Sequence, residues 1–418
     1  MSAATTAIEP ESPGMPRLLA GMRADGGALS LDAHLRHHGP LPERGLELIA
    51  VIERAGLTGR GGASFPAARK LEAVSGRSRP VLVANGMEGE PASGKDKVLL
   101  TYAPHLVLDG VVLAARAVGA RKAIVATSSK TADATIARAL GERRDRGISI
   151  RQVIGPSRFV SGEETALVHF LNGGPALPTF TPPRPFERGI DGAPTLVQNV
   201  ETLAHIALIA RHGADWFRER GTRAEPGSAL VTISGAVRNA GVYEIPLGLP
   251  LGDLVRQAGG ETGDLQAFLI GGYFGTWISA ADAASARLAD ADLAPFRASL
   301  GARAIVALPL SVCGVTETAR VARYLANESA GQCGPCVHGL AAVADDLEHV
   351  AHGKRIDDVK LRRRLSVITG RGACRHPDGA VRFVASALEV FGGEVERHLR
   401  GHRCHRRSAV LPVREGRR

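Results

Sequence analysis

A glycine-rich segment early in the chain carries the first residues whose types and spacing could do chemistry. Gly59, Gly61 and Gly62 allow the backbone to turn tightly and to bring N–H groups close to an anion, while Arg60 and Lys70 add positive charge. A ligand with phosphate groups suits this loop. The spacing matches neither the dinucleotide-binding G-x-G-x-x-G nor the P-loop G-x-x-x-x-G-K-[ST], and glycine clusters also form plain turns, so the loop alone leaves both interpretations open.

Two acidic segments follow the glycine loop. The first, over residues 85–97, comes directly after the apolar run 81–84, which predicts a buried strand. Open α/β sheets bind ligands at the carboxyl ends of their strands, so Asn85 could hydrogen-bond a heterocycle edge or a ribityl hydroxyl; the plainer alternative is a charged turn.

The second acidic segment is Ser161-Gly-Glu-Glu-Thr-Ala-Leu167. Ser161 and Glu164 have the spacing of a capping box ahead of an apolar helix. Adjacent carboxylates at the start of a helix are also stabilised by the helix dipole, so Glu163 and Glu164 do not require a catalytic explanation.

The cysteines are few and late in the chain. All five lie at Cys313 or beyond, and five cysteines are too few for a disulfide scaffold in a chain of 418 residues. The C-x-x-C pair Cys333 and Cys336, with Cys374 downstream, favours metal or redox use of the thiolates, with ordinary buried cysteines as the alternative.

Short apolar runs alternate with helical patterns in the first half of the chain, which predicts an α/β layer with parallel strand pairing. The expected strands are residues 81–84, 122–127 and 148–154, and the expected helices are residues 45–56, 104–119 and 131–146, with a further helix beginning near Thr195. A β-hairpin is expected over residues 230–245, followed by a helix over 251–260 and a strand near 268–270, which together form a small β-grasp-like unit. Beyond Cys313 the pattern is mostly helical as far as about Arg400.

Length and composition limit the classes of protein. With 418 residues, 44% of them hydrophobic and 22% charged, the chain should form two to four modules. No apolar run reaches membrane-span length and the first residues do not resemble a secretory signal, so we expect a soluble, cytoplasmic protein. The net charge of +10 should attract acidic partners, whereas 4% aromatic residues and the absence of a recognised motif argue against nucleic acid. The arginine-rich end is expected to be an exposed tail rather than a docking element.

Together with residues 192–202, these segments resemble, in order and spacing, the NADH-oxidising, FMN-binding flavoprotein subunit of respiratory complex I and its relatives in NAD-linked hydrogenases and formate dehydrogenases. The resemblance runs from about Gly45 to His398. It implies an α/β fold class, with a Rossmann-like FMN-binding domain followed by a small β-grasp (SLBB) domain and a C-terminal helical bundle of the iron–sulfur-binding type. The expected divisions are a flexible arm (1–40), the FMN/NADH-binding domain (41–226), the SLBB domain (227–312), the helical domain (313–400) and a basic tail (401–418).

The resemblance also implies roles for individual residues. The FMN and nucleotide phosphates would be held by Gly59, Arg60, Gly61, Gly62 and Lys70. The isoalloxazine and ribityl pocket would be lined by Asn85, Gly162, Glu163, Glu164, Gln198 and Asn199. Glu88 and Glu90 match acids near the nicotinamide, and Phe65 matches an aromatic that stacks on adenine. The residues implied to take part in catalysis are Glu88, Glu163 and Glu164.

Several family positions are altered in this chain. A second adenine-stacking aromatic is replaced by Ala73, and a lysine and an aromatic around the Pro-Pro pair are replaced by Thr181 and Arg184. An aspartate of the flavin-side loop appears as Met87, and a tyrosine as Phe159. Since base stacking contributes about 1 to 3 kcal/mol per aromatic, we expect weaker binding of NADH than of FMN.

The cluster motif is altered as well. The family has four cysteines that bind a [4Fe-4S] cluster, but Ala330 occupies the first ligand position here, while Cys333, Cys336 and Cys374 match the other three. Four outcomes stay open: a three-thiolate cluster with an open iron, rescue by Cys313 or Cys404, no cluster, or a zinc ion that also uses His338 or His376.

Three functions are therefore compared. The first is an FMN-dependent NADH dehydrogenase-type subunit that passes electrons from NADH to an iron–sulfur cluster or an acidic ferredoxin-like partner, without nucleic acid or a membrane span of its own. The second is a degenerate scaffold or ligand-binding paralogue. The third is a flavoprotein reduced by ferredoxin that does not use NADH.

Overall fold

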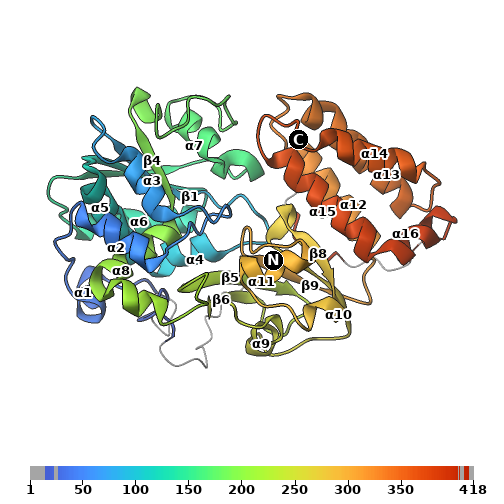
Figure 1. The fold of residues 1–418 in the computed structure, drawn as a ribbon, viewed down its shortest axis with the longest axis horizontal. Coiled ribbons are helices and arrows are strands. Elements are labelled where there is room, and N and C mark those ends of the chain that lie inside the picture. Colours follow the sequence, from blue (N-terminus) through green and yellow to red (C-terminus); the bar gives the residue numbers. More distant parts are fainter. Residues whose placement is uncertain (1–14, 23–26, 403, 405–408, 414–418) are drawn as a thin grey trace.

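Three packed parts follow one another along the chain: an α/β part, a second sheet and a helical end (Figure 1). The structure is a computed structural model, and it describes residues 15–22, 27–402, 404 and 409–413. The helical end lies beside the second sheet at the far end of the molecule from helices α1 and α2, which are defined below.

The α/β part is built on a parallel sheet with the strand order β3-β2-β1-β4. Its strands are β1 (Val81–Gly86), β2 (Lys122–Thr127), β3 (Ser149–Ile154) and β4 (Thr195–Asn199). Alternate residues of β1 enter different cores: Leu82 and Ala84 pack with the helices of one face, and Val81 and Val83 with Leu167 on the other. Burial of both faces explains why these strands read as continuous apolar runs.

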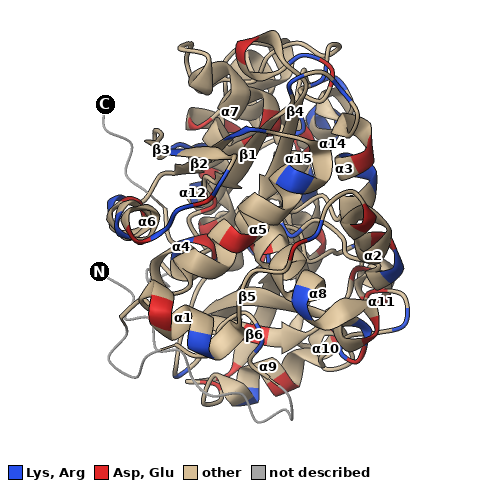
Figure 2. Ribbon diagram, turned by 90° about the vertical axis from the view of Figure 1, so that its left-hand side faces the viewer, with Lys and Arg blue, Asp and Glu red and all other residues tan. Residues whose placement is uncertain are grey.

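Helices cover both faces of this sheet (Figures 1 and 2). They are α1 (Leu31–His38), α2 (Glu47–Ala55), α3 (Ala67–Val74), α4 (Lys95–Tyr102), α5 (Pro104–Val118), α6 (Lys130–Glu142), α7 (Glu164–Leu171) and α8 (Val200–Arg218), with short 3-10 turns η1 (Phe159–Gly162) and η2 (Ile190–Gly192). The predicted elements of this part agree with the structure except that the helix expected over 131–146 ends at Glu142 and that Thr195 does not begin a helix. That residue begins strand β4, which pairs with β1, and helix α8 starts only at Val200.

The second sheet has five strands in the order β6-β5-β9-β7-β8. Its elements are β5 (Ser228–Gly235), β6 (Gly241–Pro246), α9 (Leu251–Gln257), β7 (Leu265–Ile270), η3 (Gly272–Phe274), β8 (Thr276–Ser279), α10 (Ala280–Ala283), α11 (Asp290–Leu293), η4 (Ala294–Phe296) and β9 (Ala304–Pro309). The predicted hairpin is the antiparallel pair β5–β6. Strands β8 and β9 were not predicted, and β9 completes the sheet by pairing in parallel with β5 and antiparallel with β7.

The helical end confirms the prediction of a mostly helical segment. It consists of α12 (Gly314–Asn327), the π-helical turn η5 (Pro335–Leu340), α13 (Ala341–Ala351), α14 (Asp358–Ile368), α15 (His376–Val390) and α16 (Gly392–Leu399). Helix α15 packs against β8, where the N–H of Trp277 donates to the hydroxyl of Ser386 at 3.0 Å. This contact joins the bundle to the second sheet.

A described stretch near each end of the chain is held by hydrogen bonds, which at the start contrasts with the expected flexible arm. Most arginines of the expected exposed tail lie outside the described residues, namely Arg403, Arg406, Arg407, Arg414, Arg417 and Arg418. The backbone N–H groups of Arg17, Leu18 and Leu19 donate to Glu244 on β6. At the other end, the backbone of Leu411 donates to Glu317 at 2.8 Å, and its side chain is 1% exposed. One acidic side chain at each end thus fixes a terminal segment through main-chain hydrogen bonds.

No single helix among the described residues has the length and hydropathy of a membrane span. Helices α4 and α5 have the length and hydropathy of a membrane span only when they are taken together, and the pair is bent by 95°.

The contact between α5 and α8 yields a prediction about stability. A Cβ atom added at Gly110 of α5 would collide with the main-chain oxygen of Leu203 in α8, whereas a Cβ at Gly141 of α6 would meet nothing. We expect Gly110→Ala to destabilise the fold by about 3 kcal/mol or more, because the two helices must separate. The matched control Gly141→Ala should be neutral or stabilising by up to about 1 kcal/mol. Urea denaturation measures both, and equal midpoints would contradict the packing described here.

Candidate functional site

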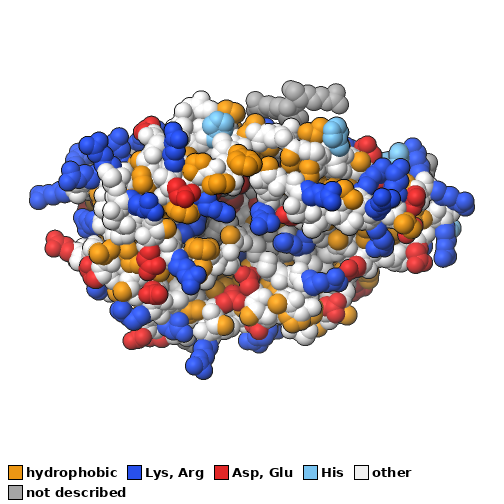
Figure 3. Space-filling view, turned by 45° about the horizontal axis from the view of Figure 1, so that its top comes forward, with side chains coloured by type: hydrophobic (Ala, Val, Ile, Leu, Met, Phe, Trp, Pro, Cys, Tyr) orange, Lys and Arg blue, Asp and Glu red, His pale blue; other side chains and the backbone are white. Residues whose placement is uncertain are grey.

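A cavity of about 700 Å³ opens where the three parts of the chain meet. It lies at the carboxyl ends of β1 and β4, where Asn85 and Asn199 are paired in register. The second sheet contributes residues around Phe274 and Gly301, and the bundle contributes residues from Cys374 to Arg382. A cleft is visible near the centre of the face in Figure 3, with Lys and Arg side chains around it.

The structure brings all but one of the residues predicted to bind cofactor into this cavity. Its lining includes Gly59, Gly61, Gly62, Phe65, Lys70, Asn85, Glu88, Glu90, Gly162, Glu163, Glu164, Gln198 and Asn199. The glycine loop is therefore open to the same space as the adjacent acids Glu163 and Glu164. Sequence reasoning missed the contributions of the second sheet and the bundle.

The glycines are needed where backbone segments approach closely. A Cβ at Gly61 would lie 3.2 Å from the Cβ of Asn199, and Gly62 has a φ of 109°, a value that side chains disfavour. A Cβ at Gly162 would collide with the main-chain oxygen of Met87. These approaches leave main-chain surface, rather than side chains, along one edge of the cavity, as a bound phosphate requires.

Arg60 is the exception, and its predicted role in phosphate binding is corrected. Its side chain is 1% exposed and does not line the cavity. Instead, the guanidinium donates to the main-chain oxygens of Pro226 and Ser228, at 3.3 and 3.2 Å, and to Thr58. Burial and the neighbouring Arg303 lower the pKa of Arg60 to about 9. Arg60 therefore joins the α/β part to β5 beneath the glycine loop.

Lys70 is the basic side chain of the loop that does reach the cavity. Its ammonium lies 3.4 Å from Glu164 and 3.3 Å from the main-chain oxygen of Val197. The side chains of Lys70 and Glu164 are both about one-third exposed, so the pair can exchange for a contact with an anionic ligand at small cost.

Glu88 and Glu163 have structural partners that limit their part in catalysis. The carboxylate of Glu88 accepts from the hydroxyl of Ser93 at 2.5 Å and from the first amides of α4, at Asp96 and Lys97. Glu163, and not Ser161, is the N-cap of α7, accepting from the amides of Thr165 and Ala166. The expected capping box is therefore wrong in register, since the residue before Glu164 caps the helix.

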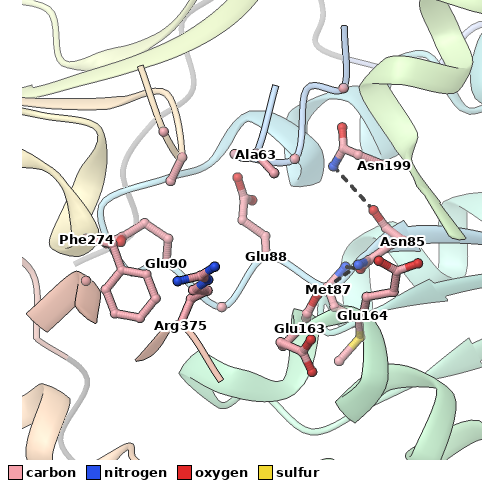
Figure 4. A pocket seen from close by; sticks show the side chains of 18 of the residues that line it. Ala63, Asn85, Met87, Glu88, Glu90, Glu163, Glu164, Asn199, Phe274 and Arg375 are labelled. Carbon is pink, nitrogen blue, oxygen red and sulfur yellow. Dashed lines mark hydrogen bonds between the residues drawn. The ribbon is translucent and has the colours of Figure 1, made fainter. Parts of the chain in front are cut away.

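Amide side chains organise the strand ends. Asn85 donates to the main-chain oxygen of Gly162 at 2.9 Å and accepts from the amide of Met87. Asn199 donates to Asp96 at 2.7 Å and to the main-chain oxygen of Asn85 at 3.3 Å, and the contact with Asn85 is drawn in Figure 4. Gln198 is 3% exposed, and its Nε2 has no protein partner among the described residues. A buried, unpartnered donor is costly unless a ligand accepts from it, so Gln198 indicates a ligand with acceptor atoms in this cavity.

The opposite wall carries aromatic and charged groups from other parts of the chain. Figure 4 shows Phe274 and Arg375 beside Glu90, across the cavity from Asn85 and Glu164. Glu90 accepts from the amide of Tyr273 at 2.8 Å, which fixes its segment to the second sheet. Phe65 is 46% exposed and is available for stacking against a planar ring.

The three cysteines of the predicted cluster lie near one another at the bundle side of the cavity. Burial and the adjacent Cys333 raise the pKa of the Cys336 thiol to about 12, and Cys374 contributes to the same shift. Cys374 also lines the cavity itself. Among the described residues, no three ligand atoms drawn from these cysteines, His338 and His376 lie within 4.8 Å of one another, so the arrangement does not match a single zinc ion. Thiolates that bind different irons of one cluster stand farther apart.

Rescue of the missing ligand by Cys313 or Cys404 does not fit the geometry. Cys336 contacts Ser329, beyond the carboxyl end of the 14-residue helix α12, whereas Cys313 precedes the start of that helix. The two ends of such a helix are about 20 Å apart. Cys404 lies beside Cys313, so both are remote from the cluster cysteines.

Comparisons with known proteins agree with this arrangement. Residues 52–208 match the family described as the Nuo51 FMN-binding domain, residues 230–270 the SLBB domain, and residues 316–398 the NADH-ubiquinone oxidoreductase-F iron-sulfur binding region. An NADH-quinone oxidoreductase subunit of Streptomyces coelicolor is 32% identical over 400 residues, which cover 90% of this chain and 89% of that protein.

Solved structures of an NAD+-reducing [NiFe]-hydrogenase share the fold. In the air-oxidized state the match has a TM-score of 0.84 at 31% identity, covering 95% of this chain and 69% of the hydrogenase chain. In the H2-reduced state the TM-score is 0.79 at 32% identity, and the match covers 85% of this chain and 63% of the other.

The position of Lys70 yields a prediction for flavin binding. Loss of a charged hydrogen bond to a phosphate costs about 1.5 to 3 kcal/mol, so Lys70→Ala should weaken FMN binding by roughly 10- to 100-fold. Arg69→Ala is the matched control, because Arg69 is exposed on the same helix and does not line the cavity. Quenching of flavin fluorescence during titration of the apoprotein measures both affinities. If both variants lose the same FMN affinity, Lys70 does not bind the phosphate.

Proposed function

Because the chain belongs to the family of the FMN-binding subunits of NADH-quinone oxidoreductase, we propose that it is an FMN-dependent electron-input subunit that oxidises NADH and passes the electrons to an iron–sulfur centre. FMN, when bound, supplies the capacity to accept a hydride and to release electrons singly. The chain's own residues supply binding, orientation and the route towards the acceptor.

One observation carries this proposal: the glycine loop, the ends of β1 and β4, and Cys374 line the same cavity. A flavin phosphate at the loop would direct the ring towards the strand ends, and Cys374 follows on the bundle side. A two-electron donor site and a one-electron exit are thereby brought together. The open cavity and the unpartnered Gln198 count against a degenerate scaffold.

Residues of the cavity divide the binding tasks. Main-chain groups at Gly61 and Gly62, with Lys70, would hold the phosphate, and Gln198 would donate to the edge of the flavin ring. We assign the exposed ring of Phe65 to stacking on the adenine of NADH. We assign Glu88 to positioning, because its carboxylate already accepts from Ser93 and from the start of α4.

The electron acceptor is proposed to dock beside the cysteine loop. A groove of about 530 Å³ is lined by Gly334 and Pro335, by three basic residues of α14 and by one beyond its end, namely Lys360, Arg363, Arg364 and Arg371. Lys and Arg side chains gather at the corresponding end of the molecule in Figure 3. An iron–sulfur partner with an acidic surface would be attracted there, and complementary charge accelerates such encounters.

The remaining assignments rest on the same proposal. We keep the division into an FMN/NADH-binding domain (41–226), an SLBB domain (227–312) and a helical domain (313–400), within which the three matched regions fall. A subunit that oxidises NADH works where NADH is available, so we place the chain in the cytoplasm.

Anaerobic purification tests the electron source. We expect a yellow protein whose flavin absorbance near ~450 nm is bleached by NADH. If the flavin stays oxidised with NADH but is bleached by reduced ferredoxin, the electron donor is ferredoxin and not NADH. A colourless protein that does not take up FMN would overturn the proposal in favour of a scaffold.

Iron content tests the cluster region. Restoring the first ligand position with Ala330→Cys should raise the iron and acid-labile sulfide per chain, because a fourth thiolate closes the cluster. The matched control Ala326→Cys adds a thiol on α12 outside the cysteine loop and should leave iron unchanged. Elemental analysis of both variants after anaerobic reconstitution gives the result. If the iron content of Ala330→Cys does not rise, the bundle is structural only.

A further inference from the structure

A second group of metal-ligating side chains lies away from the cavity, where the start of α12 meets the end of α16. The Sγ atoms of Cys313 and Cys404 and a ring nitrogen of His398 lie within 4.8 Å of one another. Cys313 is fully buried, His398 is 3% exposed and Cys404 is partly buried. Within residues 15–22, 27–402, 404 and 409–413, only these three side chains are grouped closely enough to share a single ion.

The imidazole of His398 is oriented for coordination. Its Nδ1 lies 3.1 Å from the main-chain oxygen of Val350, and its Nε2 lies 3.4 Å from the Sγ of Cys313. A carbonyl oxygen only accepts, so Nδ1 carries the proton and the lone pair of Nε2 faces the thiols. Metal-ligating histidines are held in the same way, by a hydrogen bond from the nitrogen that does not bind the metal.

A carboxylate lies next to the sulfur of Cys313. Oε2 of Glu394 is 3.5 Å from the Sγ of Cys313 and accepts from the amide of Gly314 at 2.9 Å. This hydrogen bond fixes the carboxylate at the start of α12. From there it can orient a water molecule in the fourth position of a four-coordinate site.

We propose that Cys313, His398 and Cys404 bind one Zn²⁺ ion, with Glu394 beside the fourth position. Two thiolates and an imidazole form a ligand set that binds zinc in preference to magnesium or calcium, which take oxygen ligands. On binding, each thiol releases a proton to solvent and forms a Zn–S bond, and no electrons are transferred. The site needs no oxidant, unlike a disulfide between the same cysteines.

The proposed ion would act as a structural link. It would join the residue before α12, the last turn of α16 and the segment beyond Leu399. Close by in sequence, Leu411 is already held on α12 by Glu317. Because α12 separates Cys313 from the cluster cysteines by about 20 Å, the zinc site is independent of the flavin and of the iron–sulfur region.

Zinc binding to the full chain tests this inference. After chelation and dialysis, we expect calorimetric titration to show one Zn²⁺ per chain with release of about two protons. Cobalt should give the absorption bands of a tetrahedral ion with thiolate-to-metal charge transfer. Cys404→Ser should weaken zinc binding by more than the roughly 10- to 100-fold that changes around a ligand cost. The matched control Cys333→Ser, which alters the other cysteine group, should keep the zinc affinity.

Three results would overturn the inference. They are the absence of stoichiometric zinc binding, zinc that is lost in Cys333→Ser but kept in Cys404→Ser, and a Cys313–Cys404 disulfide in freshly purified protein detected by thiol labelling. The cobalt spectrum of Cys404→Ser gives a second readout of the same site, because loss of one thiolate should lower the charge-transfer intensity. Flavin content serves as a separate readout and should not change in Cys404→Ser.

Discussion

A buried charge cluster at the wall of the cavity is the constraint on which the site depends. The ammonium of Lys95 lies 2.6 Å from Asp96 and 2.9 Å from Glu201, and all three side chains are buried. Burial by itself lowers the pKa of Lys95, but the carboxylates of Asp96 and Glu201 outweigh it, so the pKa is raised and the lysine stays charged. Such a cluster is stable only when every member is present, because a lone buried charge costs several kcal/mol.

The cluster fixes the cavity because its members also bind the surrounding elements. Asp96 accepts from Asn199 at the end of β4, and Glu201 accepts from the amide of Leu230 in β5 at 2.9 Å. The start of α4, which carries Lys95 and Asp96, is in turn held by Glu88. The strand ends, the acidic loop and the second sheet therefore take their relative positions from one set of ionic contacts.

Two buried arginines place positive charge beneath the glycine loop. Arg60 and Arg303 are both buried, and Nη2 of Arg303 lies 3.5 Å from the main-chain oxygen of Gly59. Neither side chain lines the cavity, but charges in a low-dielectric interior act over longer distances than in water. Positive charge behind the loop thus favours an anion in front of it, so Arg60 can support phosphate binding without contact.

The sequence was sufficient for the alternation of strands and helices in the first half of the chain and for most of the residues that line the cavity. It was not sufficient for strands β4, β8 and β9 or for the directions of individual side chains. The parallel strands were predicted because apolar runs and helical patterns alternate, and the glycine positions were predicted because only glycine permits such close backbone approach. Arg60 was misplaced because its partners, Pro226 and Ser228, lie more than 160 residues away. Strand β4 was missed because its apolar residues Leu196 and Val197 were assigned to the following helix. Asn199, whose side chain caps α8, marks the boundary between the two elements.

The packing on the bundle side of the cavity explains why alanine at position 330, the first cluster-ligand position, is compatible with the shape of the cavity. The residues that follow Cys374 form this wall, and they are fixed by packing: Nε2 of His376 is 2.8 Å from the main-chain oxygen of Leu325, and Gly379 lies so close to Phe274 that a Cβ would collide with the ring. These contacts do not involve a metal. The wall of the cavity is therefore held by contacts that do not depend on the number of cluster ligands, so the change to Ala330 leaves the shape of the cavity intact.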